Sequence, residues 1–332
     1  MNTLYYYDIP QREKTESTSV IKMFLKSNYD VIECFDHQMF DIAVKKGDLF
    51  LFFQRPPSEN LISRLAGANL IYIPMYDEAR NYSRNTIRSW ASLKIVNFCR
   101  VMNEDMKNWG FNCFYTQFYP KPERTEIDLC EKNTAFYWRR ESCYINEAIP
   151  PRLVKKIVGN NPMKLHVHSE TFHDDEQDII EIIESRSTWF DKKEDMMKML
   201  RSCSMYLAPR ESEGIGLSFL EAMANGLAVV GADNPTINEY ITDGANGYLY
   251  NLLAPRPLNI KKLCEVRKRS LESCAAGFER WEREKWDLLN FIDEPPKGKT
   301  SVAVPRGFLY NSLKLANPSF RLKRMAKRIL GK

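Results

Sequence analysis

The chain has 332 residues, which at roughly 150 residues per domain predicts two compact domains. Apolar residues make up 44% and charged residues 27%, the usual balance of a soluble globular protein, so wholesale disorder is excluded. The net charge of +5 is a mild excess, whereas a nucleic-acid binder is usually more basic. We therefore expect no nucleic-acid partner.

Neither a membrane span nor a secretory signal is expected. The longest strictly apolar stretches run five to seven residues, as at 49–53 and 226–232, and a spanning helix needs about 20. The first residues, MNTLYYYDIPQREKTES, lack the basic and apolar regions of a signal peptide. The eight cysteines include no C-x-x-C pair, so we expect reduced thiols in a cytoplasmic protein.

In chain order, short apolar runs alternate with helical patterns. Strands are expected at 49–53, 70–75, 94–99 and 113–118, and again at 135–138, 164–168, 204–208 and 227–231. Helices are expected at 60–66 and 103–109, and then at 151–158, 175–185, 193–203 and 217–225. Alternation of this kind predicts an α/β fold with parallel sheets covered on both faces.

The boundary between the two domains is expected in the polar stretch 120–133, which contains KPERTE. This gives a first doubly wound domain at 1–130 and a second at 131–294. A long helical pattern at 259–292 ends the second domain and carries an apolar stripe that includes Leu263, Val266 and Trp281. Three prolines within 295–305 stop it, so 295–332 is expected to be a linker followed by a basic helix.

The segment 204–251 carries the chemistry. It begins as a strand (SMYLA), a loop (PRESEGIG) and a helix (LSFLEAMAN). The first N–H groups of a helix are unpaired, and its dipole favours an anion. Gly214 and Gly216 bracket the junction and let a phosphate approach the backbone. Because ligands sit beyond the carboxyl ends of parallel strands, this loop predicts an anion site.

Two glutamates accompany that loop. Glu213 lies in it, and Glu221 lies in the helix among Leu217, Leu220 and Met223, where an unpartnered carboxylate is costly. A hydroxyl-rich ligand would satisfy both carboxylates. The alternative is that both simply complement the helix N-terminus, worth a few tenths to about 1 kcal/mol. Spacing alone leaves both interpretations open.

The stretch EGIGLSFLEAMANGLAVV closely resembles the E-x7-E signature of retaining GT-B glycosyltransferases, the family 4 or group 1 type of bacterial surface-glycan biosynthesis. The downstream EYITDGANGYLY and the helix at 193–203 also resemble that family. Together they cover about sixty contiguous residues, while the N-terminal half resembles it only in outline. The resemblance implies two Rossmann-like domains that face each other across a cleft.

The resemblance also implies roles for individual residues. Glu221 would bind the ribose hydroxyls of a nucleotide-diphosphate sugar, and Glu213 would contact the donor sugar. A basic pair after the first strand of the second domain corresponds to Arg139 and Arg140, whose forked donors suit a diphosphate. The alternative for one of these arginines is a solvated strand end. Backbone N–H groups would hold the diphosphate at Gly214, Ile215, Gly216 and Leu217.

This sequence departs from the family pattern at several places. ESCYIN stands where a Lys-Gly pair is usual, and the polar stretch 8–19 replaces a glycine-rich loop. His168 and Ser169 replace the glycines that usually end the second strand of the donor domain. No family histidine maps onto the first domain. Asp77, in IYIPMYD, is the nearest match there for a catalytic group, and its alternative role is a turn or cap.

No metal ion and no cofactor other than the sugar donor are expected. Glycosyltransferases of the other main fold hold Mg²⁺ or Mn²⁺ with an Asp-x-Asp triplet, which this sequence lacks. With only four histidines, no ligand cluster can be assembled by spacing. The residues His173, Asp174, Asp175 and Glu176 are interpreted as the polar N-terminus of the next helix.

We therefore expect a retaining, metal-independent glycosyltransferase of the hexosyltransferase type. It would move a sugar from a nucleotide-diphosphate sugar to a glycan or polyprenyl-linked acceptor, in cell-surface polysaccharide biosynthesis. The alternatives are a catalytically silent GT-B scaffold and a membrane-peripheral partner protein. A phosphorylase-like or epimerase-like reaction on the same fold is a further alternative within the enzyme class.

The last residues, 320–332, read FRLKRMAKRILGK. Apolar side chains at 322, 325, 326, 329 and 330 form one stripe of a helix, and basic side chains fill its other faces. Such a helix can lie in the headgroup region of an anionic membrane. This predicts a peripheral location on the inner face of the membrane; the alternative is a helix packed on the first domain.

Overall fold

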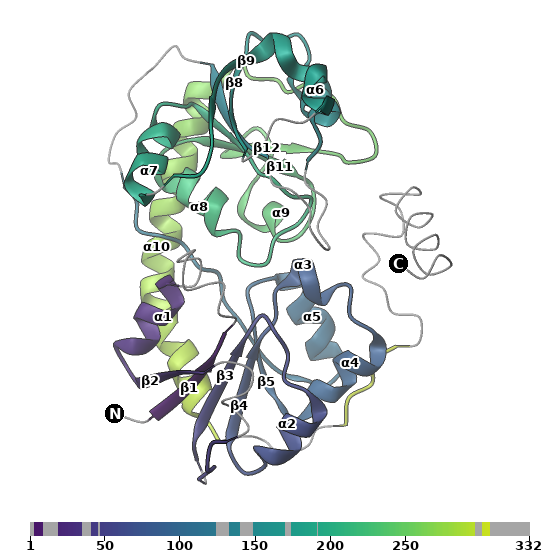
Figure 1. Cartoon of the computed structure of the whole chain (residues 1–332), viewed down its shortest axis with the longest axis vertical. Helices are drawn as coiled ribbons and strands as arrows, with labels where there is room; N and C mark the ends of the chain where they lie inside the picture. Colours follow the sequence, from purple (N-terminus) through teal and green to yellow (C-terminus); the bar gives the residue numbers. More distant parts are fainter. Residues whose placement is uncertain are drawn as a thin grey trace. The chain divides into compact units, whose positions relative to one another are not determined.

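The computed structural model describes residues 3–8, 19–34, 41–45, 47–123, 133–139, 149–169, 174–190, 192–295 and 301–305. Within these ranges the chain forms two compact units. The first unit comprises the described residues up to Phe118 together with those from Arg280 to 305, and the second runs from Tyr119 to Glu279. Each unit is built on its own six-stranded sheet (Figure 1).

The first sheet has the strand order β2-β1-β3-β4-β5-β6, and every neighbouring pair is parallel. Strands β3 and β4 are buried along their whole length, as expected for the apolar run LFLFF and for NLIYI, which is apolar after its first residue. The six strands are β1 (Thr3–Tyr7), β2 (Asp30–Cys34), β3 (Leu49–Phe53), β4 (Asn69–Ile73), β5 (Lys94–Asn97) and β6 (Asn112–Tyr115).

Short helices connect the strands of the first unit. Ser58 caps α2 by accepting a hydrogen bond from the N–H of Leu61 at 3.2 Å, and Ser83 caps α4 in the same way. Each hydroxyl satisfies one of the backbone donors that a helix start leaves unpaired. The helices are α1 (Ser19–Lys26), α2 (Glu59–Arg64), α3 (Tyr76–Ala79), α4 (Arg84–Arg88) and α5 (Arg100–Asn108).

The second sheet is also wholly parallel, with the order β12-β11-β10-β7-β8-β9. Counted along the chain, this is 3-2-1-4-5-6, so the sheet grows outward in both directions from its middle. Nucleotide-binding doubly wound folds have this order. The strands are β7 (Thr134–Trp138), β8 (Lys164–His168), β9 (Ile183–Ser187), β10 (Met205–Leu207), β11 (Ala228–Ala232) and β12 (Gly247–Tyr250).

One core cluster of the second unit lies on one face of this sheet. Alternate strand residues such as Ala135, Leu165 and Val230 are buried there against Ile157 of α6 and Val266 of α10. The alternate residues Phe136, Tyr206 and Val229 are buried as well. The helical segments are α6 (Pro151–Val158), the 3-10 helix η4 (Asp174–Ile182), α7 (Lys193–Arg201), α8 (Leu217–Ala224), α9 (Ile237–Tyr240) and α10 (Leu263–Asp293).

The carboxyl end of α10 is held by two polar side chains of the first sheet. Lys94 is buried, and its Nζ donates to the carbonyls of Phe291, Ile292 and Glu294 at 2.7, 2.7 and 2.6 Å. Asn69 Nδ2 donates to two of the same carbonyls, at 2.7 and 3.1 Å. The last carbonyls of a helix have no partner within it and favour positive charge. Burial lowers the pKa of Lys94 to about 8.

The α/β fold with parallel sheets is confirmed in both units. Four strands were not expected from the sequence: β1, β2, β9 and β12. The helix expected at 175–185 is wrong in its second half, because η4 ends at Ile182 and the edge strand β9 follows at once. The residues of the expected basic helix, 320–332, lie outside the described ranges.

The division between the units lies elsewhere than the expected boundary at 130–131. It falls between Phe118 and Tyr119, and the chain returns to the first unit at Arg280, inside α10. The return follows from packing, since the last carbonyls of α10 are bound by Lys94 and Asn69 of the first sheet. Within the described ranges, no helix is both long enough and apolar enough to cross a membrane.

Replacing Lys94 should destabilise the protein strongly. In Lys94→Met, the buried carbonyls at the end of α10 lose a charged donor, which should lower the free energy of unfolding by about 3 kcal/mol. Urea unfolding followed by tryptophan fluorescence measures this. Lys268→Met, on the exposed face of the same helix, is the matched control and should shift stability by no more than about 0.5 kcal/mol. Equal stability of the Lys94 variant and its parent would contradict the assignment.

Candidate functional site

The carboxyl edge of the second sheet positions the predicted anion site. The chain order of its strands reverses between β7 and β10, which are parallel neighbours. In open parallel sheets, ligands bind outside the carboxyl ends of the strands at such a reversal. Strand β7 ends at Trp138 and β10 ends at Leu207. Arg139 and the loop 208–216 therefore follow these strands at the same edge.

Gly216 ends this loop and precedes the first residue of α8. Its φ of 81° and ψ of 38° are left-handed, a conformation that residues with side chains rarely adopt. A Cβ built on Gly216 would lie 1.9 Å from Cε1 of Phe219. Both the backbone conformation and the packing of Phe219 therefore require glycine here.

Six successive backbone N–H groups, at residues 214–219, have no acceptor among the described residues. The hydrogen bonding of α8 begins with the N–H of Leu220, which donates to the carbonyl of Gly216 at 3.1 Å. The donors of a first helical turn carry partial positive charge and commonly bind phosphate. This row of donors can bind several oxygens of a diphosphate.

Glu213 directly precedes that row and is largely buried, with 7% of its surface exposed. The hydroxyl of Thr236, itself buried, donates to the Glu213 carbonyl at 3.1 Å and fixes the loop from the turn before α9. Arg210 Nη1 lies 3.8 Å from Glu213 Oε2. Burying a carboxylate is costly unless its charge is compensated, so Arg210 and the start of α8 both stabilise this one.

Glu221 lies in the second turn of α8 and pairs with α7. Its Oε1 is 2.8 Å from Nζ of Lys193, and its side chain is 26% exposed. The sequence indicated that this carboxylate needs a partner, and Lys193 of the same chain is one such partner. The other oxygen, Oε2, has no partner among the described residues and can accept a hydrogen bond from a ligand.

Arg139 is held by two carboxylates. Its Nη2 is 2.7 Å from Asp175 Oδ1, and its Nη1 is 3.0 Å from Glu176 Oε1. Glu176 is fully buried and is also hydrogen-bonded by Arg186. The expected role of this acidic segment as the start of a helical element agrees with η4, which begins at Asp174. Its second role, as counter-charge to Arg139, could not be read from the spacing. Arg140 and His173 lie outside the described residues.

Two histidines of β8 share hydroxyl partners on β9. His166 contacts Ser185 and Ser187 through its two ring nitrogens, at 2.7 and 2.8 Å, and His168 Nδ1 lies 2.8 Å from Ser187 Oγ. The ring of His168 stacks on Phe190 with centroids 4.9 Å apart. Burial, together with neighbouring His166, lowers the pKa of His168 to about 4. The histidine is therefore neutral at physiological pH and serves as an aromatic and polar packing group.

Asp77 belongs to the first unit. It lies in α3, just after β4, and is 4% exposed. Its Oδ1 accepts a hydrogen bond from the N–H of Glu78 at 3.2 Å. Glu78 in turn accepts a hydrogen bond from Gln54, a non-glycine residue with φ of 65° at the end of β3. Asp77 thus makes the turn contact that was its alternative role, and its catalytic assignment stays a prediction.

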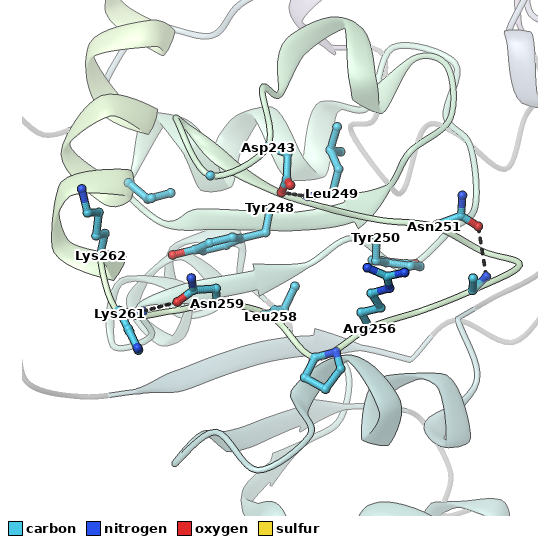
Figure 2. A pocket seen from close by; sticks show the side chains of 14 residues that line it. Asp243, Tyr248, Leu249, Tyr250, Asn251, Arg256, Leu258, Asn259, Lys261 and Lys262 are labelled. Carbon is cyan, nitrogen blue, oxygen red and sulfur yellow. Dashed lines mark hydrogen bonds between the residues drawn. The ribbon is translucent and has the colours of Figure 1, made fainter.

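A hollow of the second unit lies apart from the predicted loop. Figure 2 shows this cavity of about 700 Å³, where Tyr248 and Tyr250 of β12 meet the chain segment that carries Arg256 and Lys261. None of the predicted site residues lines it. Among the described residues, no group of three or more histidine, cysteine or acidic side chains could hold a metal ion.

Sequence reasoning missed three residues that contact the loop and α8. Arg210 stands three residues before Glu213, and this i, i+3 spacing of opposite charges could have predicted the pair. Lys193 and Thr236 reach Glu221 and Glu213 only because α7 and the turn before α9 fold against this edge. No local sequence pattern marks such contacts.

The segment around the loop and α8 is similar in sequence to known glycosyltransferases. Residues 180–252 match the family model described as Glycosyl transferases group 1. A sucrose synthase of Thermosynechococcus vestitus is 33% identical over 79 residues, 24% of this chain and 9% of that protein. The GtfA subunit of the UDP-N-acetylglucosamine–peptide N-acetylglucosaminyltransferase of Limosilactobacillus reuteri subsp. suis is 41% identical over 56 residues, 17% of this chain and 11% of that protein. The matches span about a tenth of these curated relatives.

Solved structures match over a larger share of the chain. TarM of S. aureus has a TM-score of 0.55 at 15% identity and covers 76% of this chain and 56% of its own. Anabaena HepE, in complex with UDP and glucose, has a TM-score of 0.55 at 11% identity, covering 87% and 100%. A glycosyltransferase from Rickettsia africae has a TM-score of 0.57 at 9% identity, covering 88% and 98%. This likeness concerns the fold: two parallel-sheet α/β units, as in GT-B glycosyltransferases.

The neutral state of His168 predicts a pH dependence of stability. Between about pH 6.5 and 4 the unfolded chain binds a proton that folded His168 does not, so stability should fall as the pH is lowered through this window. In His168→Gln, the free energy of unfolding should depend less steeply on pH there. Urea unfolding at pH 4.5, 5.5, 6.5 and 7.5 measures the two slopes. Identical slopes for the variant and its parent would refute this assignment.

Proposed function

We propose that the protein is a retaining glycosyltransferase that moves a sugar from a nucleotide-diphosphate sugar to a glycan or lipid-linked acceptor. The observation that carries this proposal is the row of N–H groups at 214–219, which lies at the ligand-binding edge of the second sheet. The group 1 glycosyltransferase model covers the same loop and α8. The GT-B-like fold of both units supports the same reaction class.

Each site residue has a role in this proposal. The N–H row holds the diphosphate, and Glu221 accepts hydrogen bonds from the ribose hydroxyls through Oε2. Lys193 holds Glu221 in place through Oε1. Glu213 contacts the donor sugar from its fixed position before the row. Asp77 remains a candidate catalytic group, and Arg139 and Arg140 remain candidates for stabilising the diphosphate, as the sequence predicted.

The reaction is proposed to need no metal ion. Negative charge develops on the leaving diphosphate, and preorganised N–H donors with the dipole of α8 can stabilise it as an oxyanion hole does. The absence of an Asp-x-Asp triplet from the sequence supports this. Sugar transfer should therefore continue in EDTA. Transfer that stops in EDTA and returns with Mn²⁺ would overturn this part of the proposal.

Uridine diphosphate sugars are the first donors to test. Two relatives support this choice, since GtfA belongs to a transferase that uses UDP-N-acetylglucosamine and HepE binds UDP and glucose. A lipid-linked acceptor and a role in surface-polysaccharide synthesis extend the proposal further, with residues 320–332 as the membrane contact. Sedimentation with anionic liposomes, for the full chain and for a chain ending at Pro318, tests that contact.

The two glutamates should separate donor binding from transfer. Glu221→Ala should weaken UDP binding roughly tenfold or more, because the ribose hydroxyls lose a charged acceptor. Glu213→Gln should instead reduce the rate of sugar transfer more than the affinity for UDP, because its proposed partner is the sugar. Calorimetric titration with UDP and a transfer assay followed by NMR of the product anomer measure both. Equal UDP affinity of Glu221→Ala and its parent would refute the ribose contact.

A further inference from the structure

Arg139 does not bring an uncompensated positive charge to the carboxyl edge of the second sheet. Two arginines and two carboxylates form one cluster, in which Arg139 pairs with Asp175 and Glu176 and Arg186 binds Glu176 from β9. The charges of these four side chains sum to zero. Since Glu176 is fully buried, removing Arg139 would leave part of a buried carboxylate uncompensated. The cluster therefore contributes to the stability of the fold, whether or not a donor is bound.

Arg210 lies in the loop that joins β10 to α8. Its side chain is 27% exposed, and its Nη1 is 3.8 Å from Glu213 Oε2. At this distance the two groups attract each other as charges, but they do not form a hydrogen bond. Arg210 thus brings a guanidinium, with its planar fork of donors, to within a few ångströms of the residue that precedes the N–H row.

A carboxylate beside a diphosphate site needs a counter-charge. Glu213 directly precedes the N–H row at 214–219, and its negative charge would repel the oxygens of a bound diphosphate. Arg210 offsets that charge from within the same loop. A guanidinium binds phosphate oxygens through paired, charge-assisted hydrogen bonds. The same side chain can therefore compensate Glu213 and attract the donor.

We propose that Arg210 binds the donor phosphate that carries the sugar, beside Glu213. This inference rests on the proposed function, in which Glu213 contacts the sugar and the N–H row holds the diphosphate. The phosphate bonded to the sugar is then the one nearest to Glu213, and hence to Arg210. Arg210 adds positive charge at an edge of the sheet where the charge of Arg139 is already compensated by Asp175 and Glu176.

The test compares nucleoside monophosphates with diphosphates. Calorimetry first measures the affinity of the parent protein for four pairs of nucleotides: UMP and UDP, GMP and GDP, AMP and ADP, and dTMP and dTDP. The pair that binds is then titrated into Arg210→Ala and Arg210→Lys. Arg269→Ala is the matched control, because Arg269 is an exposed arginine of α10 in the same unit. Thermal unfolding without ligand checks that each variant is folded.

Arg210→Ala should lose diphosphate affinity roughly tenfold to a hundredfold and keep its monophosphate affinity within about twofold. Arg210→Lys should recover part of the loss, since it restores the charge without the fork. Arg269→Ala should match the parent for both nucleotides.

Three results would overturn the inference. Unchanged diphosphate affinity in Arg210→Ala would show that Arg210 does not contact the donor, while the proposed function would stand. Equal loss for both nucleotides would show that Arg210 only shapes the loop. A parent protein that binds none of the diphosphates would overturn the proposed function together with this inference.

Discussion

The turn from β10 into α8 is the constraint on which the rest of the site depends. Gly216 must adopt a left-handed conformation, and Phe219 fills the space that any side chain at 216 would occupy. This geometry starts α8 directly at the carboxyl edge of the sheet and leaves the N–H groups of 214–219 without acceptors among the described residues. Thr236 then fixes the loop by binding the Glu213 carbonyl. A rigid row of donors is the consequence.

Charge compensation explains how acidic side chains are tolerated around that row. Glu221 is paired with Lys193, Glu176 with two arginines, and Glu213 with Arg210. The pairs differ in burial, and therefore in whether their side chains can contact a ligand. Glu176 itself is fully buried and its pairs serve packing, whereas the Glu221 and Arg210 side chains are partly exposed and can reach a ligand. One edge of one sheet thus combines structural ion pairs with groups suited to a nucleotide and a sugar.

The sequence was informative wherever the signal is local. Buried runs such as LFLFF predict central strands, and the order of Glu213, Gly216 and Glu221 places them on one loop and helix, as observed. Two of the missed strands, β9 and β2, are edge strands with little apolar signal, since they read IESRS and DVIEC. Contacts between distant segments were missed too, since no spacing links Arg139 to Asp175 or Glu221 to Lys193. The resemblance implied that Arg139 binds the diphosphate, which stays a prediction, and the structure adds its pairing with Asp175 and Glu176.

Hydrogen exchange of the segment 209–224 tests the central claim most directly. The N–H groups of 214–219 should exchange more slowly when UDP, GDP, ADP or dTDP is bound, because a diphosphate accepts their hydrogen bonds. The account predicts protection concentrated on these six amides, with little change at the cavity beside β12. Nucleotide binding that protects the β12 cavity and leaves 214–219 unchanged would contradict it.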